Sequence, residues 1–194
     1  MFKKTILATA VAVMAMGSVS AMASDVGLIT FDGAVTDTTC VITTNNGVEA
    51  NNVTVTLPVV KVADVAGTTI DKGVGSKEFE LHLSECPEGK TKASATFTSQ
   101  QFAELSNGTL KADPTVAGHA DNVSLALFNN TSASSDRILI GQPDNNTQVA
   151  TLTSGEGFLA FRVAYVPSAD WVKGTNDIAS GKVSSNVTFT MSYQ

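Results

Sequence analysis

Residues 183–194 read VSSNVTFTMSYQ, and from Val187 to Tyr193 apolar and polar side chains alternate at every position. Strict alternation sends successive side chains to opposite faces of an extended chain, so this stretch predicts a half-buried β-strand. A long strand with one apolar face fits two situations, a buried central strand or an edge that pairs with another chain. The pattern alone leaves both interpretations open.

The same period of two recurs along the chain. Its clearest runs are Val53–Leu57, Phe79–Leu83, Ala93–Phe97, Val123–Leu127, Ile138–Ile140 and Leu159–Tyr165. Polar segments rich in asparagine and glycine separate these runs, at 45–47, 107–108, 142–146 and 173–176, and such residues favour turns. Many short strands between turns predict a single all-β domain, a sandwich or a barrel. Thr98–Leu105 alone has a composition that would allow a helical turn.

The first residues indicate export. Lys3 and Lys4 precede an apolar run from Ile6 to Met16, and small residues follow up to Ala23. This is the pattern of a secretory signal peptide, and the run is too short for a membrane span of about 20 residues. We expect residues 1–23 to be removed, which leaves 171 of the 194 residues in the mature chain and no inserted segment.

Charge and cysteine content narrow the function classes. The net charge is −6, and loss of the two lysines at positions 3 and 4 lowers it by two to −8. An acidic chain argues against nucleic-acid binding, which requires clustered basic side chains. Cys40 and Cys86 are the two cysteines, and an exported pair favours a disulfide. Free thiols or a metal site are the alternatives, although no CxxC motif or Cys/His cluster accompanies them.

Residues 27–35 read GLITFDGAV, and alternation places Ile29, Phe31, Gly33 and Val35 on one face of a strand. Glycine within an apolar row marks either a bulge or a place where another backbone or a filled pocket approaches closely. An ordinary first strand with a bulge therefore remains one interpretation. A strand that inserts into a second surface is the other.

Three stretches together resemble a known family. Residues 27–40, GLITFDGAVTDTTC, are similar to the start of type 1-like fimbrial subunits of the chaperone–usher class, which share the strand pattern G-x-[VI]-x-F-x-G-x-[VI] before a cysteine. Residues 79–86, FELHLSEC, resemble the family's second cysteine after an alternating strand, and FTMSYQ at 189–194 resembles its last strand. The resemblance covers essentially the whole mature chain.

The resemblance implies an incomplete immunoglobulin-like sandwich with one disulfide, which donor-strand exchange completes. Residues 24–37 would form an N-terminal donor-strand arm and residues 38–194 the pilin domain. The donated side chains would be Ile29, Phe31, Gly33 and Val35, and the receiving, chaperone-binding strand would carry Val187, Phe189, Met191, Tyr193 and Gln194. The implied partners are a periplasmic chaperone, an outer-membrane usher and further copies of the chain, joined head to tail in a fimbria at the cell surface. In an isolated chain, we expect the arm to be loose or folded back on its own groove.

Other functions remain as alternatives. A minor adaptor or a tip adhesin that binds host glycans is the first, and a monomeric periplasmic carbohydrate-binding sandwich is the second. Trp171 could line a sugar site, although a single aromatic residue in a loop is more often a packing residue.

We expect no enzyme, metal or cofactor. His82 lies on the polar face of a predicted strand, His119 lies in a predicted turn, and no G-x-S-x-G motif is present. The aspartates of the polar loops do not form a D-x-[DN]-x-[DN]-G calcium motif; they are Asp121, Asp136, Asp144 and Asp177.

Overall fold

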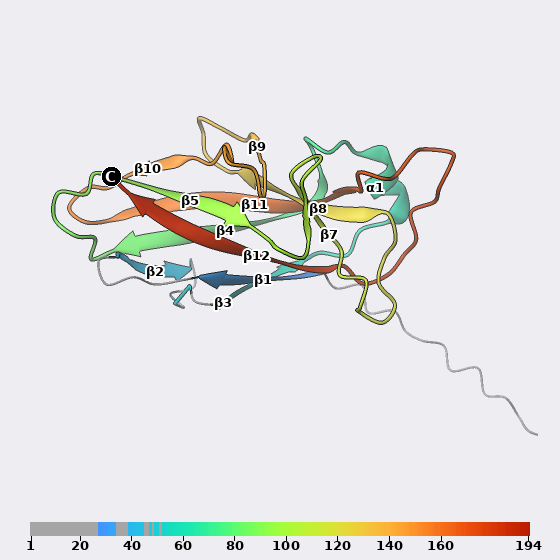
Figure 1. Ribbon diagram of the computed structural model, residues 1–194, viewed down its shortest axis with the longest axis horizontal. Coiled ribbons are helices and arrows are strands. Elements are labelled where there is room, and N and C mark those ends of the chain that lie inside the picture. The colour runs from blue at the N-terminus through green and yellow to red at the C-terminus, as the bar shows by residue number, and fades with distance from the viewer. Residues whose placement is uncertain (1–26, 34–38, 45–46, 48, 51) are drawn as a thin grey trace, which may run out of the picture.

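Two β-sheets packed face to face make up the fold, which confirms the all-β prediction (Figure 1). The computed structural model describes residues 27–33, 39–44, 47, 49–50 and 52–194, and for 27–33 only the backbone is described. The predicted signal peptide and Val35 lie outside these residues. Within the described part of the chain, no helix is long and apolar enough to cross a membrane.

The two sheets have the following strand orders. Sheet A runs β10 (Val149–Thr151), β5 (Lys92–Thr98), β12 (Ser184–Tyr193), β1 (Gly27–Gly33) and β3 (Asn52–Leu57). Sheet B runs β2 (Val41–Thr44), β4 (Val74–Ser84), β11 (Gly157–Pro167), β8 (Val123–Asn129), β7 (Thr109–Lys111) and β6 (Ala103–Glu104), and β9 (Arg137–Ile138) pairs with β8. A single short helix among the described residues, α1 (Val62–Gly67), lies at the end of the long axis opposite the C-terminus (Figure 1).

Aromatic side chains join the two sheets in the core. Phe97 of β5 meets Phe161 of β11 edge to face, with ring centroids 5.1 Å apart, and Phe79 of β4 lies 5.5 Å from the same ring. Edge-to-face contacts are a preferred geometry for aromatic pairs. Because all three side chains are 4% exposed or less, this cluster closes the sandwich at its centre.

The centre of sheet B is buried on both faces, which differs from the half-buried strands that the alternation predicts. All seven residues of β8 are buried. On the outer face, Phe128 and Val166 pack with Ile70 from the segment after α1, and the guanidinium of Arg162 lies 3.7 Å from the centre of the Phe128 ring. The segment after α1 therefore shields this face from water.

The predicted helical turn at Thr98–Leu105 is wrong. Those residues end β5, turn and enter the short strand β6, because Phe102 is buried in the core and its carbonyl accepts a hydrogen bond from the N–H of Lys111. The predicted turn at Asn107-Gly108 is present. Gly108 has a φ of +72°, and a Cβ there would lie 2.8 Å from the Cα of Leu139. Glycine suits both the positive φ and the lack of room for a side chain.

Candidate functional site: the β1 position in sheet A

The first strand of the chain lies inside sheet A and not at its edge. β1 runs parallel to β12 on one side and antiparallel to β3 on the other, and Figure 1 shows the three strands side by side. We call this place between β12 and β3 the β1 position. It is the surface that the donor-strand hypothesis concerns.

The register aligns β1 with the buried rows of both neighbours. Phe31 lies opposite Val187 of β12 and Val53 of β3, and Ile29 lies opposite Ser185 and Val55. The four neighbouring residues Val53, Val55, Ser185 and Val187 are between 1% and 7% exposed. Since residues opposite one another in a sheet share a face, the backbone places Ile29 and Phe31 in register with the core side of the sheet.

The third predicted arm residue, Gly33, lies opposite Phe189 of β12, which is 3% exposed. The fourth, Val35, lies outside the described residues. The structure thus brings Ile29, Phe31 and Gly33 beside the strand that carries Val187 and Phe189.

The far half of β12 reaches the disulfide end of the molecule. Met191 and Tyr193 are half-buried and pack against a small cluster that contains Cys40 and Leu83. Burial raises the pKa of the Tyr193 hydroxyl, and the neighbouring backbone of Cys40 acts in the opposite direction. Gln194 pairs with β5 by backbone hydrogen bonds, since its carbonyl accepts the N–H groups of Thr91 and Lys92 at 2.7 and 3.0 Å.

The opposite end of the β1 position opens into a cleft. Gly27 lies opposite Leu57, and the chain that follows Leu57 forms one wall of a hollow of about 520 Å³. Its apolar lining includes Val60, Val65, Tyr165 and Val183. Leu28 lies opposite Ser184, the first residue of β12, and Val183 directly precedes it. The cleft therefore lies next to the first residue of β1.

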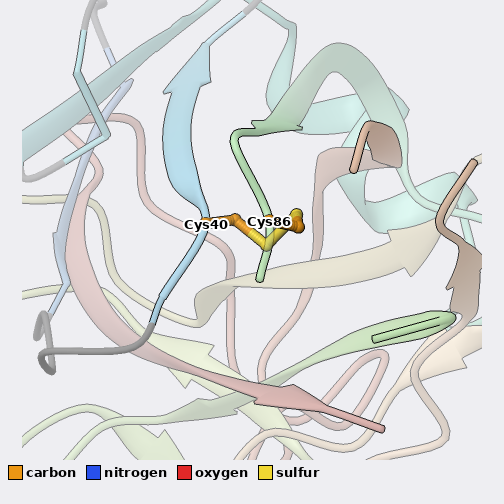
Figure 2. Close-up of a disulfide and its surroundings, with 2 residues drawn as sticks. All are labelled: Cys40 and Cys86. Atoms are coloured by element: carbon orange, nitrogen blue, oxygen red, sulfur yellow. A yellow bond between two sulfur atoms is a disulfide. The ribbon is translucent and has the colours of Figure 1, made fainter. Parts of the chain in front are cut away.

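The disulfide anchors the chain where it leaves the β1 position. Cys40 and Cys86 are bonded, as predicted, with their Cα atoms 4.1 Å apart. Figure 2 shows that the bond joins the start of β2 to the segment that follows β4. Six residues, 34–39, connect Gly33 to Cys40.

The sequence does not indicate that two polar residues at or near this site are buried. Ser185 is 2% exposed and lies in the inward row of β12, and its hydroxyl has no hydrogen-bond partner among the residues that the structure describes. Asn145 is 4% exposed and bonds to the edge of sheet A at Phe97. Neither could be found from alternation, because serine and asparagine count as polar whichever face they occupy.

The histidines and the loop aspartates are not on β1, β3 or β12, the strands of the β1 position. His82 contacts Glu80 at 2.8 Å on the outer face of β4, and His119 lies 3.2 Å from Asp121 in a loop. Trp171, which was considered for a sugar site, packs against the main core and is partly buried. Among the residues that the structure describes, no three or more His, Cys, Asp or Glu side chains gather as a metal site would require.

Comparison with known proteins gives consistent matches. A family model described as "Fimbrial protein" matches residues 29–194. The chain is 30% identical over 186 residues to the F17 fimbrial protein of Escherichia coli, covering 94% of this chain and 95% of that protein. It is 26% identical over 200 residues to Long polar fimbria protein A of Salmonella typhimurium, covering 100% of this chain and 98% of that protein.

Among solved structures, the CupB6 tip adhesin from Pseudomonas aeruginosa is similar at 13% identity and a TM-score of 0.41. The match covers 76% of this chain and 51% of that structure, so this chain spans about half the length of the adhesin.

Proposed function

The chain belongs to the fimbrial protein family, and on that premise we propose that it is a structural subunit of a bacterial fimbria that polymerises by donor-strand exchange. Each subunit would insert its residues 24–37 into the β1 position of a neighbour. Cell adhesion by the assembled surface fibre would follow from this polymer.

The placement of β1 is the observation that carries the proposal. A strand at the start of the mature chain occupies the interior of sheet A, yet only the segment 34–39 joins it to the rest of the domain. Without it, β12 and β3 would each present an unpaired backbone edge above a row of apolar side chains. Unpaired edges of this kind accept strands from other chains, and donor-strand complementation is a recognised case.

Exchange of this strand between copies yields a filament. The donating surface, residues 24–37, differs from the accepting surface, so the contact is head to tail. Repetition of such a contact builds an open filament. The two fimbrial relatives match nearly the full length of the chain, which supports a subunit role for the chain as a whole.

The proposed partners are those that the resemblance to chaperone–usher subunits implies. Before assembly, an apolar channel between β12 and β3 requires cover, so we expect a periplasmic chaperone to lend a strand and an outer-membrane usher to receive the subunit. Export by the signal peptide at residues 1–23 would bring the chain to the periplasm. We assign the chain no catalytic role. A minor adaptor or a glycan-binding tip subunit is the alternative place for it in the fibre.

Expression in cells with and without a fimbrial chaperone and usher tests the proposal. We expect a ladder of multimers that withstands cold detergent only when both partners are present, and surface fibres that contain the chain. A chain with residues 24–37 deleted should be captured by the chaperone and should end the ladder at one copy. Fibres of normal length from that deletion would contradict the proposal.

A further inference from the structure

The outer side of β3 is the longest bare strand edge among the residues that the structure describes. β3 is the last strand of sheet A and has six residues, and in that part of the chain only β1 pairs with it. The strands at the other ends of the two sheets, β10, β2 and β6, have three, four and two residues. We infer that this edge docks the β3 edge of a second copy of the chain, antiparallel and about a two-fold axis at Thr54. The contact is distinct from donor-strand exchange, because it uses the side of β3 that faces away from the β1 position.

β3 lacks the features that keep edge strands from pairing with other chains. Such edges are protected by charged side chains, proline, bulges or a covering segment. β3 contains no charged residue and no proline, and its pairing with β1 continues from Asn52 to Leu57 without a register shift. The opposite margin of sheet A differs, because the side chain of Asn145 accepts a hydrogen bond from the N–H of Phe97. The described part of the chain provides no such cover for β3.

The sequence of β3 is complementary to itself in the antiparallel direction. Val53, Thr54 and Val55 read the same from either end. In the register centred on Thr54, Val53 of each copy lies opposite Val55 of the other. Asn52 lies opposite Thr56 in the same register. A two-fold contact requires a surface that fits itself, and Thr–Thr pairs are favourable between neighbouring strands.

The symmetry limits the register. A two-fold axis between antiparallel strands is perpendicular to the sheet, so the cores of both copies lie on the same side and buried positions must meet buried positions. Because exposed and buried residues alternate along β3, the axis must pass through a residue and not between two residues. A centre at Val55 would put Pro58, which has no N–H, opposite Asn52. A centre at Thr54 keeps the proline outside the paired segment.

Charge favours the pairing of two copies at this edge. The chain is acidic, but β3 carries no charge, so no carboxylates of the two strands face one another. Antiparallel pairing also brings the start of β3 in one copy beside its end in the other. Glu49 precedes the strand and Lys61 follows it, so opposite charges approach at both ends of the contact.

A ladder of five residues is small, so the pair is weak in solution. Stable interfaces bury about 1,200 to 2,000 Å², and one pair of strands covers less. A fibre presents the same edge once per subunit, and many weak contacts then act together. Lateral bundling of fibres is the expected result. This last step rests on the proposed function, whereas the pairing of two copies does not.

Cysteine cross-linking of the purified mature chain tests the contact and its register. Thr54→Cys introduces one free thiol, since both native cysteines are in the disulfide. We expect mild oxidation to link two copies at least tenfold faster than in Thr190→Cys, which has an exposed thiol on the central strand β12. A mixture of Asn52→Cys and Thr56→Cys should link as fast as Thr54→Cys. Asn52→Cys alone should not link, because its two thiols would lie four residues apart along the ladder.

A charge on the edge gives the second readout. Thr54→Lys and Thr190→Lys change the net charge equally, but only the first places a lysine on the edge, where lysine opposes pairing. In sedimentation equilibrium, we expect the dissociation constant of the pair to rise at least tenfold in Thr54→Lys and to stay unchanged in Thr190→Lys. In electron micrographs, wild-type fibres should bundle and Thr54→Lys fibres should lie singly.

Each contrary result has a defined meaning. Equal cross-linking of Thr54→Cys and Thr190→Cys, or unchanged association of Thr54→Lys, overturns the contact. Faster linkage in a mixture of Thr54→Cys and Thr56→Cys than in Thr54→Cys alone overturns the register. Cross-linking of Thr54→Cys only to a different protein of the periplasm assigns the edge to that protein and overturns the pairing of copies. Bundles that persist in Thr54→Lys overturn the role in fibres. Cross-linked pairs from a chain that never forms fibres overturn the proposed function and leave the contact supported.

Discussion

The side-chain amide of Asn145 takes the place of a strand beside Phe97 at one edge of sheet A. Its Oδ1 accepts a hydrogen bond from the N–H of Phe97 at 2.5 Å, and its Nδ2 donates to the carbonyl of Leu139 at 2.9 Å. The N–H of Gly141 donates to the carbonyl of Phe97 at 3.0 Å. The loop thus continues the pairing of β5 beyond β10, which covers an edge that would otherwise attract other chains.

Replacement of Asn145 by alanine should lower the free energy of unfolding by about 2 to 3 kcal/mol, because it removes the acceptor of a buried N–H and the donor to two partly buried carbonyls. Urea denaturation of the purified mature chain measures this. Asn186→Thr, at an exposed position of β12, is the control and should change stability by less than about 0.5 kcal/mol. Equal stability of the two variants would show that the Asn145 side chain contributes no net stability.

The sequence predicts most of the strands but not how deeply they are buried. Alternation identifies β3, β5 and β12 because each has one face toward the core and one toward water. β8 is buried on both sides, and nothing in its residues indicates the remote segment that covers it. The short helix α1 was missed because six residues give too little helical period to detect.

The candidate site, like the fold, can be predicted from the sequence only in part. The burial of Val187 and Phe189 is predicted from their place in an alternating row, and the disulfide is predicted from two cysteines together with the expected export signal. Alternation does not predict which strand fills the β1 position. An apolar face indicates that something covers it, but it does not indicate which molecule does.

Removal of the disulfide should destabilise the isolated chain strongly. Cys40 and Cys86 are 46 positions apart, and closure of a loop of that size stabilises a fold by about 4 kcal/mol on the chain-entropy estimate. We expect the double variant Cys40→Ser, Cys86→Ser to show a markedly lower Tm and a smaller yield of folded protein from the periplasm. An unchanged Tm would mean that the bond adds nothing to stability.

A side chain at Gly33 should stop fibre growth. In the proposed fibre, this residue enters a shallow part of the neighbour's channel, where a larger residue would clash. Gly33→Asn should still be recovered with its chaperone, while detergent-resistant multimers fall at least tenfold. Asp32→Asn introduces the same side chain one position away, opposite the exposed Thr188, and should assemble normally. Wild-type ladders from Gly33→Asn would refute the assignment of the arm.

The buried hydroxyl of Ser185 should cost stability. Because this hydroxyl has no hydrogen-bond partner in the described part of the chain, Ser185→Ala removes an unsatisfied polar group and should leave the free energy of unfolding unchanged or raise it by up to about 1 kcal/mol. Denaturant titration at constant m-value is the measurement. A loss of more than about 1 kcal/mol would reveal a partner for this hydroxyl.

The ion pair between Glu104 and Lys111 should make stability weakly pH-dependent. The two groups are 2.7 Å apart, and the hydrogen bond from Lys111 lowers the pKa of Glu104, while Glu104 raises the pKa of Lys111. The contribution of the carboxylate is present above its ordinary value of 4.5 and is lost as the pH falls through the lowered value. That of the amine is present below 10.5 and is lost above the raised value.

Since Lys111 is half exposed, Lys111→Met should cost at most about 1 kcal/mol at pH 7. At pH 3 the difference from the wild-type chain should shrink. Unfolding curves at the two pH values test this, and a difference that grows on acidification would contradict the sign.

The position of the disulfide determines how a fibre of such subunits would bear tension. Pulling on a donated arm loads the chain at Cys40, immediately before the short strand β2 at the end of sheet B. Alone, that strand would peel away one hydrogen bond at a time. The bond to Cys86 passes the force to the end of β4, which is paired on both sides and must shear along its length before it yields. The disulfide at Cys40 thus protects the adjoining strand β2 from being pulled out of its sheet when the arm is under tension.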